Sequence, residues 1–372
     1  MEDSKEVKRL YSIDVFRIIC ALMVFLFHSR IHINVNYGIL NTFIGTGHIF
    51  MVAFFMLSGF SLFYVDSQRG KFNENSEYKN IGNFLRKRIL NLYPLYIFLY
   101  LLYILQQFIK VHVLNQTIDG HLGILDNIIA SPVELSLLQS VLIGSFSLLH
   151  NGGTWFISCI FICYIFYPYI VQIVNSNSCK YNIWLAIFLY CIASYAFLPV
   201  YKFHFSSIYA NPLLRFVEFS IGIVIEKFFV ENCYKEIKKN FWLIVLSCYI
   251  LLCFVITFGV HYISGAVEMY NFVAIPCFGC ILYLSGRLEC KYGISHLRKI
   301  ISVLSENTYA FFLAQFFAWE PAKYLMTHTT FFDSYGNIKK IVISTAWTCL
   351  VTVVLHYCIE KPCKKLTKKF LE

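Results

Sequence analysis

The sequence predicts an all-α, polytopic membrane protein, a helical bundle of about ten transmembrane helices with both termini in the cytoplasm. Three observations support this class. Of the 372 residues, 58% are hydrophobic and only 14% are charged, which leaves too little polar surface for a water-soluble domain of this length. Apolar stretches long enough to cross a bilayer recur along the whole chain. Lys and Arg are concentrated in alternate loops, as in membrane proteins with a fixed orientation.

Ten apolar stretches have roughly the 17–25 residues that a hydrocarbon core of about 30 Å requires. They lie near residues 13–31, 43–65, 89–109, 154–174, 181–201, 212–230, 241–260, 269–286, 302–325 and 341–359. The first is interpreted as a true span, because no small-residue cleavage site of a signal peptide follows it. The ninth is the most polar, with Ser305, Glu306 and Asn307 at its start and Glu320 and Lys323 near its end.

The distribution of Lys and Arg predicts the orientation. With the amino end inside, the inner loops and tails hold 22 of these residues, whereas the outer loops hold only Lys110 and Lys202. This bias predicts an even number of spans in a multi-pass protein of the plasma or inner membrane. Segment 135–149 is too short to span and is expected to be re-entrant or a surface helix, because an eleventh span would place the Lys-rich tail outside. The net charge of +10 therefore indicates topology and anionic lipid, and gives no case for nucleic acid.

We expect residues 1–372 to form a single integral-membrane domain, with short cytoplasmic tails at 1–12 and 360–372. The 14 cysteines lie mostly inside predicted helices without a His partner at zinc-ligand spacing, so they are interpreted as packing residues, and no metal site is expected. Ser58 and Gly59 are interpreted as small residues that allow close helix packing.

Ionisable residues interrupt the first apolar stretch, "SIDVFRIICALMVFLFHSR" (12–30). Arg17 and His28 are eleven residues apart, so on a helix they share one face about 16 Å apart along the axis, and Asp14 lies on the same side. Such residues are costly in a membrane and often functional. In the alternative interpretation, Arg17 only extends toward the inner surface and pairs with Asp14, while His28 is a hydrogen-bonded histidine at the membrane interface.

Seven motifs follow one another in an order that resembles the acyltransferase family 3 membrane proteins. After the Asp, Arg and His of the first helix come "FFMLSGF" (54–60), "RKRILNLYPLY" (86–96), "GTWFISCIFICYIFYP" (153–168), "LLRFVEFSIGIVIEK" (213–227), "NTYAFFLAQ" (307–315) and "IEKP" (359–362). No single motif is specific, but the ordered set is. Three positions depart from the family pattern: Gln315 stands in place of a late His, Asn91 in place of a second Arg, and Ala53 in place of an Asp.

The resemblance implies an enzyme that transfers an acyl group, usually acetyl, from cytoplasmic acyl-CoA to a hydroxyl of an extracytoplasmic or lipid-linked glycan such as a cell-surface polysaccharide. Among the residues, His28 suits a general base because a neutral imidazole can accept the hydroxyl proton, and a covalent acyl-histidine is the other route. Asp14 and Arg17 would shape the inner end of the path. The basic run Arg86, Lys87 and Arg88 could hold the CoA phosphates, or could only anchor the helix at the membrane surface.

Candidate acceptor-binding residues lie toward the predicted outer ends of two helices. Trp155, with His150 and Asn151 just before it, offers an aromatic face and polar groups to a sugar, although an interfacial tryptophan is the simpler interpretation. Glu320 is a further candidate, with a solvated loop carboxylate as its alternative. Gln315 is included because of its position in the motif, with its role in doubt.

Two other function classes stay open. A transporter or flippase of a glycan or small molecule would also need intramembrane charges, but transporters often have two related halves, and no internal repeat is visible. A family member without activity could serve as a scaffold. The acyl group, the glycan, a covalent or direct mechanism and the oligomeric state do not follow from the sequence.

Overall fold

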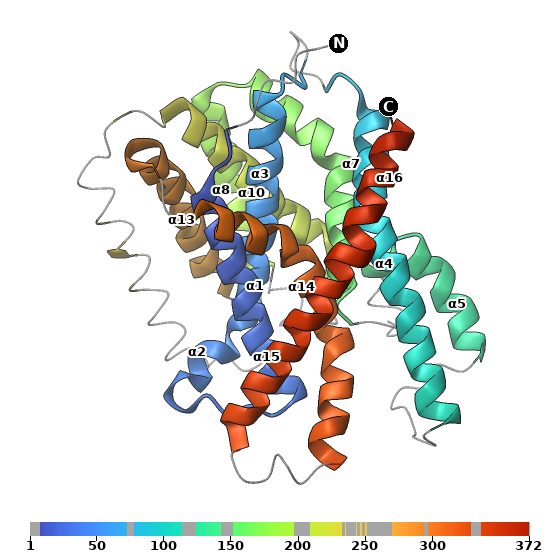
Figure 1. The fold of residues 1–372 in the computed structure, drawn as a ribbon. Coiled ribbons are helices and arrows are strands. Elements are labelled where there is room, and N and C mark those ends of the chain that lie inside the picture. The colour runs from blue at the N-terminus through green and yellow to red at the C-terminus, as the bar shows by residue number, and fades with distance from the viewer. Residues whose placement is uncertain are drawn as a thin grey trace.

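The structure, a computed structural model, describes residues 8–72, 78–113, 124–142, 152–196, 209–232, 270–293, 297–328 and 336–371, with a few positions between 235 and 250. Within these ranges the chain is helical apart from turns, short loops and an isolated bridge between Phe72 and Tyr78. The long helices are α1 (Tyr11–His32), α3 (Phe50–Gln68), α4 (Ile81–His112), α7 (Trp155–Ser176), α8 (Cys179–Tyr195), α10 (Pro212–Asn232), α13 (Asn271–Tyr292), α14 (Arg298–His328) and α15 (Gly336–Val354). A π-helix (Leu355–Glu360) continues α15 into α16 (Lys361–Leu371) (Figure 1).

Six segments are long and apolar enough to cross a membrane, which confirms the all-helical, multi-pass class. They are Tyr11–His32, Gly38–Gln68, Ile81–His112, Trp155–Ser176, Asn271–Tyr292 and Gly336–Thr367. Three further predicted spans are helical but outside this set: α8 has only 17 residues, α10 carries several charged side chains, and α14 is polar near its start. The predicted span 241–260 lies almost wholly outside the described residues. The count of ten spans therefore stays a prediction.

Helix boundaries differ from the expected ones in two places. The predicted span 43–65 begins with the short α2 (Asn41–Gly45) and a 3-10 turn (Gly47–Ile49), and the long helix starts only at Phe50. The glycines that bracket this start are poor helix residues, which accounts for the broken first turns. Helix α4 begins at Ile81, earlier than predicted, because the side chain of Asn80 caps it by accepting a hydrogen bond from the Asn83 backbone N–H (2.9 Å).

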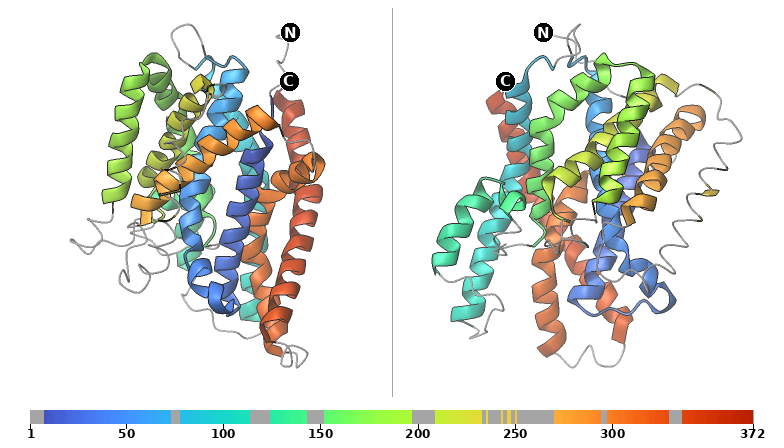
Figure 2. Two further views of the ribbon diagram at one scale, coloured as in Figure 1. Left: turned by 90° about the vertical axis from the view of Figure 1, so that its left-hand side faces the viewer. Right: turned by 180° about the vertical axis from the view of Figure 1, so that it is seen from behind.

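A helix that the sequence analysis did not predict, α5 (Ile124–Leu135), lies beside α4 (Figures 1 and 2). Tyr96 donates its hydroxyl to the Glu134 carbonyl (2.8 Å) and Tyr100 donates to the Ser131 hydroxyl (2.6 Å), which ties the two helices together. Of the segment 135–149, the structure describes the short α6 (Gln139–Leu142), and residues 143–149 lie outside the described ranges. The prediction of a re-entrant segment is therefore not tested.

The start of α1 and the end of α16 point toward the same end of the bundle (Figure 1). This arrangement agrees with an even number of spans. The side of the membrane on which both ends lie stays a prediction.

Glycines allow α3 and α10 to cross in close contact at the centre of the bundle. A Cβ atom on Gly59 would lie 2.0 Å from the Phe219 carbonyl oxygen, and one on Gly222 would lie 1.9 Å from the Met56 carbonyl oxygen. No side chain fits at these distances, so the two backbones approach each other only because both positions lack a Cβ. The close-packing role expected for Gly59 is thus confirmed, and Gly222 is its partner.

The helices divide into central and peripheral ones. Each of the six candidate membrane spans contains an 18-residue stretch that is apolar enough to cross the membrane. Of this stretch, 67% is buried in the segment that contains α3, and 61% is buried in α7 and in α13. The shares in α4 and in the α15–α16 segment are only 22% and 28%, and α8 lies at the outer edge (Figure 2). Helices α4 and α16 therefore turn one face to the central helices and leave most of their surface toward lipid or water. The boundary between these two helices and the central ones is a suitable place for a cavity.

Candidate active site

The start of α1 is held by a network of charged and hydroxyl groups. The Glu289 carboxylate of α13 accepts hydrogen bonds from the backbone N–H groups of Tyr11 (3.0 Å) and Ser12 (2.7 Å). Two of the unpaired donors at this helix start are thereby satisfied by a carboxylate, which also suits the positive end of the helix dipole. The position of α1 relative to α13 is fixed by the same contact.

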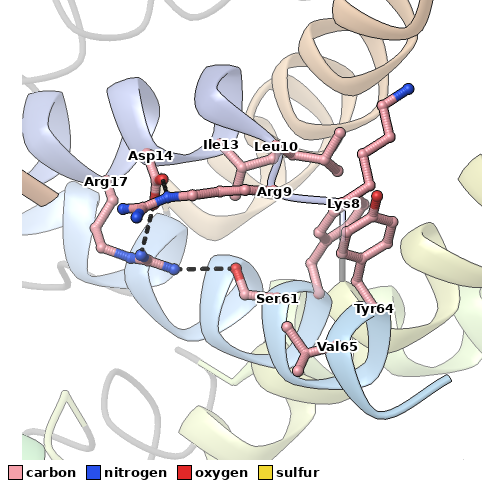
Figure 3. A pocket seen from close by; sticks show the side chains of 10 residues that line it. Lys8, Arg9, Leu10, Ile13, Asp14, Arg17, Ser61, Tyr64 and Val65 are labelled. Atoms are coloured by element: carbon pink, nitrogen blue, oxygen red, sulfur yellow. Dashed lines mark hydrogen bonds and ion pairs between the residues drawn. The ribbon is translucent and has the colours of Figure 1, made fainter. Parts of the chain in front are cut away.

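Asp14, buried at 5% exposure, is the centre of this network (Figure 3). Its carboxylate accepts from Arg17 (2.9 Å), so the predicted Asp14–Arg17 pair is present, and also from the Ser305 hydroxyl of α14 (2.6 Å) and from Arg9 Nε (2.6 Å). Burial disfavours the charged form of Arg9, but hydrogen bonds and charge from Asp14 and Glu306 outweigh it and leave the pKa of Arg9 above its usual value. Asp14 therefore joins the chain before α1, α1 itself and α14.

Arg17 lines two cavities. A cavity of about 230 Å³ is lined by Arg17 together with Lys8, Arg9, Asp14, Ser61 and Tyr64 and neighbouring apolar side chains (Figure 3). A larger cavity of about 400 Å³ is also lined by Arg17. Arg17 is fixed in place, because it donates to Asp14, to Ser305 (3.1 Å) and to Ser61 of α3 (3.1 Å). Its three partners come from three helices, which hold the charge in one place.

The larger cavity joins a basic part to an aromatic part. Its lining includes the cations Arg17, Arg88 and Lys364, the polar groups Ser58, Asn91, Thr308, Tyr164 and Tyr309, and the apolar side chains Phe54, Leu92, Phe156, Ile160 and Phe312. The rings of Phe54, Phe156 and Phe312 contact one another, with centroids 5.0–6.1 Å apart. An elongated ligand with an anionic end and a less polar end matches such a lining.

The three residues of the basic run lie in different surroundings. Arg88 lines the larger cavity, and its guanidinium carbon lies 5.2 Å and 5.3 Å from the ring centroids of Phe84 and Tyr164. Arg86 and Lys87 are exposed and are outside the cavity lining. Successive helical residues point about 100° apart, so only one of the three faces the cavity, and Arg88 is the one that can meet a bound phosphate there.

His28 meets Gln315, a contact that crosses from α1 to α14. The Gln315 amide nitrogen donates to the Phe312 carbonyl (2.9 Å), so its oxygen is the atom that lies 3.3 Å from His28 Nδ1. An amide oxygen can only accept, which assigns the hydrogen to Nδ1 and the lone pair of the ring to Nε2. Gln315 is fully buried. The residue whose role the motif comparison left in doubt therefore orients the candidate base.

The cavity and His28 are connected through one turn of α14. Phe312 lines the aromatic part of the larger cavity, and its carbonyl holds Gln315, which contacts His28. Arg17 and His28, predicted to share one face of the first helix, both lie on α1. Arg17 lines the basic part of the cavity. One face of α1 thus presents a fixed cation and an oriented imidazole to the same side of the bundle.

The candidate acceptor residues have mixed outcomes. Trp155 starts α7 and packs in a cluster around Arg215, with its ring 5.7 Å from the guanidinium carbon and 5.1 Å from the Tyr209 ring. Arg215 is itself fully buried and paired with Glu218 (2.7 Å). His150 and Asn151 lie outside the described residues, as does the side chain of Glu320, whose backbone belongs to α14. Their binding roles stay predictions.

Sequence reasoning did not single out Lys364 or Ser305 as site residues. In the sequence, Lys364 lies beyond the last predicted span and contributes only to the inner charge, yet the unbroken helix carries it to the cavity. Ser305 stands in the sequence as a polar residue at the start of the ninth stretch. Its signal was available, since a hydroxyl in an apolar helix usually has a buried polar partner.

The fold and the site define a multi-pass helical membrane protein with a basic cavity, whose lining residue Phe312 holds Gln315, the partner of His28. A family model described as an acyltransferase domain, Acyl_transf_3, matches residues 10–357. The chain belongs to this acyltransferase family, as the ordered motifs predict. Comparisons with characterised proteins and with solved structures found no significant match.

Proposed function

We propose that this acyltransferase is an O-acetyltransferase of the cell membrane, which moves an acetyl group from cytoplasmic acetyl-CoA to a hydroxyl of an extracytoplasmic or lipid-linked cell-surface polysaccharide. The observation that carries the proposal is the 400 Å³ cavity, which combines three cations with an aromatic part next to the His28 partner Gln315. Its chemistry suits CoA, whose phosphates are anionic and whose pantetheine arm is long and much less polar.

The donor would bind with its phosphates at the basic part of the cavity. Arg88 is the suitable first partner, because it forms no ion pair with any described residue and its guanidinium already lies over the rings of Phe84 and Tyr164. Arg17 is committed to Asp14, Ser61 and Ser305, so it contributes a fixed positive charge near the path of the arm. A fixed charge costs no reorganisation when the substrate binds.

His28 would then act on the acceptor. With hydrogen on Nδ1, Nε2 can take the proton of a sugar hydroxyl as the hydroxyl oxygen attacks the thioester carbonyl. The new C–O bond forms as the C–S bond breaks, and the CoA thiolate leaves and recovers the proton from His28. The ring is positively charged between these two transfers, and the hydrogen bond from Nδ1 to Gln315 is stronger in that state than in the neutral one.

The test is turnover of the thioester. Purified protein in proteoliposomes receives labelled acetyl-CoA, and free thiol and labelled glycan are measured with and without a de-acetylated surface polysaccharide from cells that lack the protein. We expect thiol release that depends on the acceptor, with label in the glycan in equal amount. Absence of both products from well-folded protein would overturn the proposal and favour transport or a scaffold role.

A further inference from the structure

A row of three ionisable side chains runs along the carboxyl-terminal helix toward the larger cavity. His356 and Glu360 belong to the π-helix, and Lys364 lies on the first turns of α16, which packs against α4 (Figure 1). Each is four residues from the next, so all three follow one side of the helix. π-helices are rare and are often found at functional sites. The last of the three, Lys364, reaches the cavity wall.

Glu360 has a separate partner for each of its carboxylate oxygens. His356 Nδ1 donates to Oε2 (2.8 Å), and the Lys364 ammonium pairs with Oε1. Glu360 and His356 are buried, at 2% and 7% exposure, whereas the Lys364 side chain is 43% exposed. A buried carboxylate is costly without partners, and this one has a second partner that does not depend on Lys364.

The three cations of the cavity are held in different ways. Arg17 has three hydrogen-bond partners and is fixed, and Arg88 is flanked by aromatic rings. Lys364 is the most exposed of the three, with its side chain 43% exposed against 28% for Arg17, and it has a flexible four-carbon stem with three donors that can rotate. Asn91, in the same lining, supplies an amide but no charge. Lys364 is therefore the cation that can move toward an entering anion.

We propose that Lys364 is an exchangeable phosphate-binding residue, whose ammonium turns from Glu360 to a phosphate of the donor while His356 keeps Glu360 hydrogen-bonded. The inference rests on the proposed function and adds the residue that recognises the phosphorylated part of the donor. A lysine suits this task because it binds phosphate as a point charge without a fixed orientation. His356 and Glu360 are positioning residues, since they act only through Lys364.

The experiment compares two donors that carry the same thioester. Acetyl-CoA contains phosphates, whereas S-acetylpantetheine, used at high concentration, contains none. In Lys364→Met, we expect kcat/KM for acetyl-CoA to fall about tenfold, as loss of one charged contact implies, mainly through KM, while kcat/KM for S-acetylpantetheine stays unchanged. Lys364→Arg should keep most of the preference for acetyl-CoA. Lys365→Met, which changes the exposed neighbour on α16, is the matched control and should leave both donors unaffected.

If Lys364→Met slows both donors equally, or slows neither, the inference is overturned. A wild-type enzyme that uses both donors with the same kcat/KM would also overturn it, although turnover itself would still support the proposed function. If Lys364→Met leaves Glu360 too poorly paired for folding, the double variant Lys364→Met, Glu360→Gln removes both charges together, and the same loss of preference for acetyl-CoA is expected.

Discussion

Replacement of Gln315 by Leu tests whether this residue orients the catalytic imidazole. Leu keeps the approximate volume of the side chain but removes the oxygen that lies 3.3 Å from His28 Nδ1. A hydrogen bond of this kind contributes about 0.5–1.5 kcal/mol, which corresponds to roughly a 2- to 12-fold fall in kcat. The long distance argues for the lower part of this range in the neutral state, and the charged ring that forms during the reaction argues for the upper part. We therefore expect about a tenfold fall in kcat, with little change in KM for acetyl-CoA.

The assay is acceptor-dependent thiol release by purified protein, with thermal unfolding as a check that the fold persists. Gln315 also donates to the Phe312 carbonyl, so some loss of stability is expected beside the kinetic effect. The double variant His28→Ala, Gln315→Leu separates the two effects, because Gln315 can act on kcat only through His28. It should be no slower than His28→Ala alone. Wild-type kcat in Gln315→Leu, or a full additional loss in the double variant, would refute the orienting role.

Three further predictions follow from the cavity, the helix crossing and the charge bias. Arg88→Met should raise KM for acetyl-CoA about tenfold because it removes a charged contact in the cavity. Arg86→Met, at an exposed position, should leave KM unchanged, and equal effects of the two variants in a kinetic assay would show that the basic run acts as a whole. Gly222→Ala should lower stability by about 1–3 kcal/mol through overpacking against α3. Thermal unfolding would compare it with the control Gly152→Ala, where a Cβ meets nothing within 4 Å, and equal stability of the two variants would contradict the close crossing. Cysteine labelling of intact cells should find both termini inaccessible from outside, and an accessible carboxyl end together with an inaccessible amino end would reject the even number of spans.

Much of α1 was predictable from the sequence, because local spacing decides which residues share a helical face. Asp14 and Arg17 are three residues apart, so their pairing follows from helix geometry alone, and it is present in the structure. The contacts of Asp14 with Ser305 and Arg9 were not predictable. They depend on how α14 and the chain before α1 pack against α1, and a single sequence contains no direct signal of that packing.

The basic run and the carboxyl end show the same limit. Helix periodicity implies that Arg86, Lys87 and Arg88 cannot all face one cavity, but the choice of Arg88 depends on the rotation of α4 against α7. The sequence predicts that Lys364 belongs to a cytoplasmic tail, because polarity rises after the last apolar stretch. The helix in fact continues through the π-helix, and the tail becomes part of the cavity wall.

The central claim is that His28 is the base of an acyl transfer. The most direct measurement is acceptor-dependent thiol release from acetyl-CoA by purified His28→Ala and His28→Gln proteins, with their membrane levels and thermal unfolding matched to wild type. Glutamine keeps hydrogen bonding but cannot take up a proton at neutral pH, so both variants should lose about 10²- to 10⁴-fold in rate, the usual contribution of general acid–base catalysis. Wild-type rates in a well-folded His28→Ala protein would contradict the account.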